Sequence, residues 1–451
     1  MKPKKVLIIS FSFPPAGGSR VQRPLKFAKY LGSFGWEVYV VAAREMSGTK
    51  DLSLLEDIPK GMSVERVFSP DPVGMETALR GAGENGMNRV FYILLKVLLK
   101  VYSIVYYRVV TVDWYEGWVP FGLKAAEKTV RRENIDIIYV HGQPPSSFLI
   151  GRTLKKRTLK PLVIDYDDPW TTSVYARRDK RSNAVRAGKL EKEILSCADA
   201  VLSAKPDTIR DIKTAFPEVD TGKMHFLPNG YDPEDYKGIE KKRGGKFTIT
   251  YVGRLSEKYC YSPESFLLAL GALIEEGKIS KDDIRVNFAG TISAAYYGRM
   301  DKLIKDLGLV DVINLLGFIG HRECMRLVVG SDLLLLLMES LGGIKESMMF
   351  AGSIPAKIFE YIPTGVPVLG IVPPGFESDL IRDTRTGFTA EANNVDSIKS
   401  TLEGIYRRYK TGVLGVDPEP EEIAKYDRKV LAGKLAAIMD ALVAKDRKGN
   451  S

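Results

Sequence analysis

Cysteine and histidine are scarce in this sequence, with three of each among 451 residues. Cys197, Cys260 and Cys324 lie far apart, and their odd number argues against a disulfide framework. So few histidines argue against a metal centre with several histidine ligands. We therefore expect a reducing, cytoplasmic compartment, and neither a bound metal nor another cofactor.

Two common signals are also absent. Residues 1–10 run directly into an apolar, strand-like stretch without a small-residue cleavage site, so we expect no secretory signal peptide. The glycines after this stretch do not form G-x-G-x-x-G, which argues against a dehydrogenase. What is present is the composition of a globular protein, with 45% hydrophobic and 27% charged residues. A chain of 451 residues predicts two domains of about 200 residues each.

The formal net charge of +10 is unevenly distributed. Residues 91–160 hold twelve Lys and Arg against five Asp and Glu. Such a basic stretch suits nucleic acid, an anionic membrane or a phosphorylated substrate. Its tyrosines alternate with Leu and Val instead of polar residues, which argues against stacking on single-stranded nucleic acid. We expect no nucleic-acid partner.

Short apolar runs alternate with longer, helix-like segments, as in parallel sheets whose two faces are covered by helices. Nine of these runs predict buried strands: 6–12, 37–43, 135–141, 161–166, 198–204, 246–253, 284–290, 331–337 and 366–372. A charged, glycine-containing stretch at 236–246 predicts a linker. The sequence thus predicts two Rossmann-like, doubly wound α/β domains, at 1–235 and 247–420. A helical segment at 421–451 follows and is a candidate for crossing back to the first domain.

Residues 91–112 form an apolar stretch almost long enough to span a bilayer as a helix. Its polar residues share one narrow helical stripe: Lys96, Lys100, Ser103 and Tyr107, with Arg108 beside it. Two lysines near the middle of a span would cost about 2.5 to 3.5 kcal/mol each, which argues against a transmembrane helix. Two interpretations stay open. The helix lies in the interface of an anionic membrane, or it belongs to a core and its lysines reach water along one edge.

Glycines and a histidine follow two strands of the first half. Gly17 and Gly18 precede a helix that contains Arg20 and Arg23. A glycine pair before a helix N-terminus allows the backbone to approach an anion. His141 ends the third predicted strand, and ligands of open α/β sheets bind beyond such strand ends. A loop histidine without function fits the same pattern.

A third strand end brings Asp165, Asp167, Asp168 and Trp170 together in the sequence. The acids either meet a metal ion or acceptor hydroxyls, or Asp168 simply caps a turn before Pro169. Both interpretations stay open.

Cations follow a strand of the second half. Gly253, Arg254 and Lys258 come at the end of the strand predicted at 246–253. Two cations after a glycine suit a pyrophosphate, because Arg grips two oxygens and Lys supplies a point charge.

A helix that begins near residue 353 carries further candidates. Ser353 is a candidate cap and Pro355 suits the first turn, so backbone amides around Ile354 would attract phosphate. Lys357 and Glu360 are three residues apart and share one helix face. The carboxylate of Glu360 is able to accept both hydroxyls of a ribose, although an isolated acid here would more often be structural.

In their order and spacing these segments resemble the family-four (group 1) glycosyltransferases of the GT-B fold. The resemblance covers most of the chain and rests on PPAGGSRVQR (14–23), His141 with its PP loop, LPNGYDPEDY (227–236), YVGRLSEK (251–258) and IFEYIPTGVPVLG (358–370). The segments DYDDPW (165–170) and WYEGW (114–118) are similar to a bacterial or archaeal branch acting on surface-polysaccharide or lipid-linked acceptors.

This resemblance implies two domains facing across a cleft. It also implies transfer of a sugar from a nucleotide-diphosphate donor, here a UDP-sugar co-substrate, with retention of configuration and no metal ion. The catalytic residues that it implies are His141, Arg254 and Lys258. The donor-binding residues are Gly17, Gly18, Gly253, Arg254, Lys258, Ser353, Ile354, Lys357 and Glu360. Acceptor-side candidates are Arg20, Asp167, Asp168 and Trp170.

Two departures from the family pattern stand out. The family commonly has two glutamates separated by seven residues. Glu360 corresponds to the second, but Gly352 occupies the first position, so that contact is missing or comes from Glu346. Lys258 also follows Arg254 more closely than is usual. A nucleotide-sugar epimerase of the same fold and a non-catalytic nucleotide-sugar-binding protein therefore remain alternatives.

Overall fold

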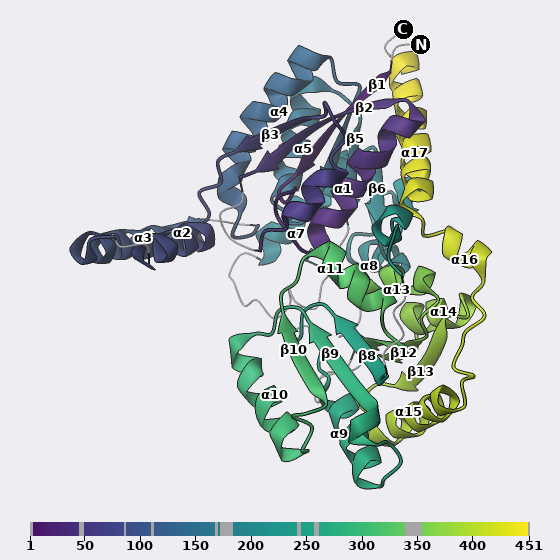
Figure 1. Ribbon diagram of the computed structural model, residues 1–451. Coiled ribbons are helices and arrows are strands. Elements are labelled where there is room, and N and C mark those ends of the chain that lie inside the picture. The colour runs from purple at the N-terminus through teal and green to yellow at the C-terminus, as the bar shows by residue number, and fades with distance from the viewer. Residues whose placement is uncertain are drawn as a thin grey trace. The chain divides into compact units, whose positions relative to one another are not determined.

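The computed structural model describes nine stretches of the chain: 3–44, 49–84, 87–109, 112–166, 170–171, 184–240, 245–256, 261–338 and 354–449. They form two compact units. The first consists mainly of Met1–Pro228 and Leu431–Ser451, and the second of Asn229–Phe350 and Ile354–Val430. Each unit has a parallel sheet with helices on both faces, as Figure 1 shows, which confirms the predicted α/β class.

The sheet of the first unit has seven parallel strands in the order β3-β2-β1-β4-β5-β6-β7. They are β1 Lys4–Ser10, β2 Trp36–Ala43, β3 Ser63–Val67, β4 Ile137–His141, β5 Leu162–Tyr166, β6 Ala200–Ser203 and β7 Met224–Phe226. Four short 3-10 helices lie between them: η1 Gly32–Phe34, η2 Leu52–Asp57, η3 Glu116–Trp118 and η4 Thr221–Lys223.

Alternate side chains of the central strand β1 enter two separate cores. Val6 and Ile8 pack with α1 (Ser19–Leu31) and with α17 (Arg428–Gly449), the last helix of the chain. Leu7 and Ile9 pack on the opposite face. The described helices on that face are α4 Val119–Glu133, α5 Ser147–Thr158, α7 Ala184–Cys197 and α8 Pro206–Ala215. Because both faces are covered, the inner strands are almost wholly apolar.

A pair of helices, α2 (Pro72–Glu84) and α3 (Arg89–Val109), extends away from this sheet. The two helices pack on each other, and Figure 1 shows them reaching outward from the rest of the first unit. At the base of the pair, the hydroxyl of Tyr102 donates to the carbonyl oxygen of Pro70 at 2.7 Å. The hydroxyl of Tyr106 accepts from the amide of Gly117 at 2.7 Å.

The sheet of the second unit has six parallel strands in the order β10-β9-β8-β11-β12-β13. They are β8 Phe247–Val252, β9 Ile284–Ala289, β10 Ile313–Gly317, β11 Leu333–Leu337, β12 Val368–Val372 and β13 Gly387–Glu391. One face packs against α9 Glu264–Glu275, α10 Ala294–Asp306 and α15 Val395–Lys410. The other packs against α11 His321–Val329, α13 Lys357–Tyr361, α14 Phe376–Asp383 and α16 Pro420–Ala424. The described residues of this unit also form three 3-10 helices: η5 Pro233–Tyr236, η7 Lys281–Asp283 and η8 Ile362–Thr364.

The units divide between Pro228 and Asn229, ahead of the linker predicted at 236–246. Tyr236 is packed within the second unit, where its hydroxyl donates to the carbonyl oxygen of Glu360 at 2.7 Å. At the other end of the chain, residues from Leu431 onward belong to the first unit.

Candidate functional site

Each sheet has one point where its strand order reverses. In the first unit this point lies between β1 and β4, and in the second between β8 and β11. Helices leave such neighbouring strands toward opposite faces, so a crevice opens beyond their carboxyl ends, where α/β proteins bind ligands. The predicted glycines, His141 and Arg254 all come at the ends of these strands.

The glycine pair of the first unit follows β1 and leads into α1. The amide of Gly17 donates to the carbonyl oxygen of Thr49 at 2.8 Å, which fastens the loop to the residues after β2. Gly18 is the N-cap residue of α1 and has a φ of 96°, a conformation that favours glycine. Because the glycines have no side chain, a ligand can approach the backbone at the start of this 13-residue helix.

His141 is the last residue of β4, and its side chain is fully buried. The following loop is fixed from two sides. The amide of Gly142 donates to the carbonyl oxygen of Asp165 at 3.0 Å. The amide of Ser146, at the start of α5, donates to the carboxylate of Asp113 at 2.6 Å. Nothing in the sequence singled out Asp113, because its partner lies on a different segment.

Asp113 is itself an unusual carboxyl group. Burial raises its pKa to about 6, while hydrogen bonds from the amides of Ser146 and Tyr115 oppose this shift. It connects the residues after α3 with the loop that carries His141.

Asp165 forms a buried ion pair with Arg23. The Nε–Oδ2 distance is 2.6 Å and the Nη2–Oδ1 distance is 2.9 Å. Asp165 also accepts from the hydroxyl of Tyr139, and Arg23 donates to the carbonyl oxygens of Leu227 and Pro228. Full burial and the ion pair with Arg23 argue against the interpretation that Asp165 serves a metal ion or an acceptor.

The acceptor-side candidates lie in different surroundings. The guanidinium of Arg20 is 6.0 Å from the ring centre of Tyr115. Trp170 is only 8% exposed and packs in the core, and its amide donates to the hydroxyl of Tyr166. Asp167 and Asp168 lie outside the described residues.

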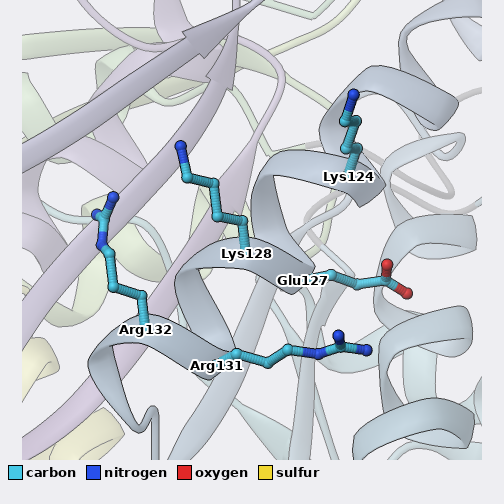
Figure 2. Close-up of a pocket in the computed structure, with 5 residues that line it drawn as sticks. All are labelled: Lys124, Glu127, Lys128, Arg131 and Arg132. Atoms are coloured by element: carbon cyan, nitrogen blue, oxygen red, sulfur yellow. The ribbon is translucent and has the colours of Figure 1, made fainter.

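A further pocket of the first unit is lined by one helix. Figure 2 shows its five residues, all from α4: Lys124, Glu127, Lys128, Arg131 and Arg132. Glu127 pairs with Arg157, and the Nε of Arg132 lies 2.6 Å from Glu133. None of the five follows a strand end, so we assign the pocket no part of the donor site. Its cations belong to the basic stretch predicted at 91–160.

The second unit places Gly253 and Arg254 directly after β8. Gly253 has a φ of 124°, which L side chains rarely adopt. The Arg254 side chain is exposed, and its backbone carbonyl accepts from the hydroxyl of Tyr251 at 2.8 Å. The hydrogen bond from Tyr251 thus stabilises the turn after the strand, while the guanidinium of Arg254 stays accessible to solvent.

Lys357 reaches this same turn from α13. Its Nζ donates to the hydroxyl of Tyr251 at 2.7 Å and lies 4.1 Å from the centre of that ring. The ring of Tyr261 is 4.7 Å away on another side. A Cβ atom at Gly253 would come within 2.8 Å of the Lys357 Cε and would displace the end of that side chain. Burial lowers the pKa of Lys357 to about 7, and the charge of Glu360 opposes this shift.

The start of α13 differs from the prediction. The helix begins at Lys357 with Ala356 as its N-cap residue, so the expected cap at Ser353 is wrong. Ile354 precedes the helix and is buried in the core. Glu360 is half-buried in the same short helix as Lys357. Several candidates lie outside the described residues: Lys258, Glu346, Gly352 and Ser353.

Helix α3 exposes an unusually apolar surface. Nine of its apolar residues are between 49% and 76% exposed: Val90, Phe91, Ile93, Leu94, Val97, Leu98, Val101, Ile104 and Val105. Lys96 and Lys100 are exposed among them. This contradicts the interpretation of a core helix, in which these side chains would be buried. Among the described helices, none is both long enough and apolar enough to cross a membrane.

Two family models match the chain. The model described as Glycosyl transferases group 1 matches residues 232–411, and that described as Glycosyltransferase Family 4 matches residues 96–235. No curated protein sequence matches the chain.

Solved structures with the same fold have low sequence identity to the chain. Sucrose-phosphate synthase from Thermosynechococcus elongatus has a TM-score of 0.65 at 14% identity, with 98% of this chain and 100% of that chain covered. Anabaena Alr3699/HepE in complex with UDP has a TM-score of 0.62 at 14% identity, with 97% and 100% covered. WaaG, a glycosyltransferase involved in lipopolysaccharide biosynthesis, has a TM-score of 0.57 at 14% identity, with 96% and 99% covered.

The resemblance inferred from the sequence motifs is thereby confirmed. The two family matches together run from residue 96 to residue 411, and both sheets are doubly wound. The chain belongs to the group 1 glycosyltransferases of GT-B fold.

Proposed function

We propose that this protein transfers a hexose from a UDP-sugar to a glycan or lipid-linked acceptor, with retention of configuration and without a metal ion. One observation carries the proposal. Gly253, Arg254, Lys357 and Glu360 gather at the end of β8, where the second sheet reverses its strand order. The UDP in the structure of HepE supports a uridine nucleotide as the donor.

The chemistry follows from the charge of the leaving group. When the bond between sugar and diphosphate breaks, the phosphate oxygens gain negative charge, and cations already in position stabilise this charge. Arg254 supplies a guanidinium that grips two oxygens. In this proposal Lys258, Ser353 and Ile354 contribute to the same diphosphate site, and Glu360 accepts the ribose hydroxyls.

The first unit would hold the acceptor and the transferred sugar. His141 would contact the sugar beyond β4, and Gly18 would offer its amide to the donor phosphate. Arg20, Asp167 and Asp168 are the candidates for acceptor contacts, whereas Trp170 packs in the core. No dedicated base is required, since the departing phosphate is able to take the acceptor's proton.

A panel of nucleotide sugars tests this function. UDP-glucose, UDP-galactose, UDP-N-acetylglucosamine and their GDP counterparts are scored by thermal shift and by hydrolysis. A true donor should raise the unfolding temperature, because a ligand that binds only the folded state stabilises it by mass action. Release of free epimerised nucleotide sugar without acceptor would instead indicate an epimerase. Binding without hydrolysis or transfer would indicate a non-catalytic binding protein.

We further propose that α3 binds the anionic, cytoplasmic face of a membrane, where a lipid-linked acceptor resides. Its exposed apolar residues supply burial, and Lys96 and Lys100 supply attraction of about 1 kcal/mol each. Salt should therefore weaken the binding to anionic liposomes without abolishing it.

A triple variant, Leu94→Ser, Leu98→Ser and Val101→Ser, tests the membrane contact. All three side chains are exposed, so the protein should fold but lose liposome binding and activity on a lipid-linked acceptor. The matched control replaces three apolar residues of the first unit that are even more exposed, Leu52, Leu159 and Val185. Liposome binding by both variants, or a dimer that the α3 variant dissolves, would remove the membrane from the proposal.

A further inference from the structure

Lys357 is held by aromatic and hydroxyl groups instead of by a carboxylate. Its Nζ donates to the hydroxyl of Tyr251 at 2.7 Å and lies within 5 Å of two ring centres, those of Tyr251 and Tyr261. Among the described residues, no carboxylate oxygen lies within ion-pair distance of it. The nearest acid with an electrostatic influence is Glu360, in the same short helix.

The hydrogen-bond pattern leaves room for a proton on Nζ. The hydroxyl of Tyr251 donates its own hydrogen to the carbonyl oxygen of Arg254 at 2.8 Å, so it acts as an acceptor toward Lys357. Lys357 can donate this hydrogen bond either as a neutral amine or as an ammonium. The tyrosine therefore positions Nζ beside Gly253 without deciding its charge.

Nζ is also next to the backbone that a phosphate would approach. It would lie 3.0 Å from a Cβ atom at Gly253, the glycine that ends β8 with a φ of 124°. Any anion seated at this glycine would face Nζ directly.

We propose that Lys357 takes up a proton when the diphosphate of a nucleotide binds beside Gly253, so that donor binding depends on pH. The proton moves from a buffer acid to the lone pair of Nζ, and the resulting ammonium pairs with a phosphate oxygen. This inference rests on the proposed donor site and states how that site acquires a further positive charge.

The physical reason is the balance between burial and charge. Burial lowers the pKa of Lys357 to about 7, because an ammonium loses the water around it. A diphosphate supplies an anion and raises the pKa. Among the described residues, the other charged or titratable groups around the site are Tyr251, Tyr261, Arg254 and Glu360, with Tyr296 and Tyr361 influencing Tyr251. Burial and its tyrosine neighbours hold the pKa of Tyr251 well above its usual range, so this phenol does not titrate in the same window.

Isothermal titration calorimetry with UDP tests the proposal at pH 8 in two buffers of different ionisation enthalpy. At that pH free UDP is already ionised, and a group with a pKa of about 7 is only about one-tenth protonated. We expect the uptake of nearly one proton per UDP bound. The affinity should then fall about tenfold per pH unit between pH 8 and pH 9.

Two comparisons isolate the residue. Lys357→Met should bind UDP more weakly and take up no proton, and its affinity should no longer vary between pH 8 and pH 9. Uridine, which lacks the diphosphate, should bind wild-type protein without proton uptake. The pH dependence of the wild type stands as evidence even where the variant folds poorly.

The outcomes separate this inference from the proposed function. UDP binding without proton uptake overturns the role of Lys357 and leaves the donor site intact. Equal proton uptake by wild type and Lys357→Met also overturns it, because another group is then responsible. Failure of both UDP and GDP to bind overturns the inference together with the donor site.

Discussion

The two units have the same kind of sheet but differ in the partners of their buried cationic side chains. In the first unit, Arg23 is only 1% exposed and shares two hydrogen bonds with the fully buried Asp165. In the second unit, Lys357 is held by tyrosines, with no carboxylate in ion-pair distance among the described residues. A neutralised pair supports folding and has no charge to offer a ligand. A lysine without a counter-ion keeps its capacity to bind an anion, and we therefore expect ligand chemistry at Lys357 and structural support from Arg23.

Breaking the pair of the first unit should have the largest effect. Arg23→Met leaves Asp165 buried and unpaired, which should lower the free energy of unfolding by about 3 to 5 kcal/mol. Denaturation with guanidinium chloride measures this change. Lys357→Met is the comparator and should alter the free energy of unfolding by no more than about 1 kcal/mol, since it removes no ion pair. If both variants lost the same free energy of unfolding, the proposed difference between Arg23 and Lys357 would be wrong.

Arg254→Ala should have the next largest effect, on catalysis instead of on folding. Loss of a charge-assisted contact that strengthens in the transition state should cost about 2 to 4 kcal/mol, or roughly 30- to 1,000-fold in kcat/KM. Because the side chain is exposed, the circular dichroism spectrum and the unfolding temperature should not change. Wild-type turnover by this variant would exclude Arg254 from the diphosphate site.

Glu360→Gln should weaken the binding of UDP by about tenfold, as expected for a lost hydrogen bond to a charged group. The effect should be much smaller for an analogue that lacks both ribose hydroxyls, because the carboxylate then has nothing to accept. Titration calorimetry with the two ligands measures the difference. If the variant binds UDP as tightly as wild type, Glu360 is a structural acid.

A buried acid of the first unit makes the free energy of unfolding depend on pH. Burial raises the pKa of Glu191 to about 8, and the amide of Thr171 donates to its Oε2 at 3.1 Å. The folded state thus binds a proton that the unfolded state has lost above about pH 4.5, so this group lowers stability as pH rises toward 8. Because one pKa unit corresponds to about 1.4 kcal/mol, Glu191→Gln should gain on the order of 4 kcal/mol relative to wild type between pH 5 and pH 9, nearly all of it below pH 8. A constant difference across this range would show that Glu191 does not titrate there.

Chelation should have the smallest effect. If cationic side chains stabilise the leaving diphosphate, transferase activity should survive EDTA unchanged. The assay compares activity before and after chelation and after addition of Mg²⁺ or Mn²⁺. Complete loss that either ion restores would turn attention to Asp167 and Asp168 instead of the second unit's cations.

A comparison of predicted and observed strands shows which strands the sequence pattern can predict. All nine predicted strands are present, and the four that were not predicted are β3, β7, β10 and β13. These are the two edge strands of each sheet. An inner strand is covered on both faces and reads as a continuous apolar run, whereas an edge strand such as β10 has mostly exposed or half-exposed side chains. The edge strands lack a continuous apolar run because their side chains are less buried, and not because the strands are short.

The site shows a similar division. Gly18, His141 and Arg254 were predictable because a strand end and the residues after it are adjacent in the sequence. The exposure of α3 was not predictable from the sequence, since an apolar helix in a core and one at a surface have the same composition. The start of α13 was also missed, because the pattern at 353–355 satisfies the rules for a helix N-terminus that the chain does not use.

By itself the sequence determined the α/β class, the two-sheet organisation and the family, because buried strands and the loops that follow them are local features. Only the tertiary structure decided what the charged residues do. Arg23 and Asp165 are 142 residues apart, and Tyr251 and Lys357 are 106 apart. Each of these contacts exists only because the fold brings distant segments together. Burial in the folded chain also lowers the pKa of Lys357, and this burial is not visible in the local sequence.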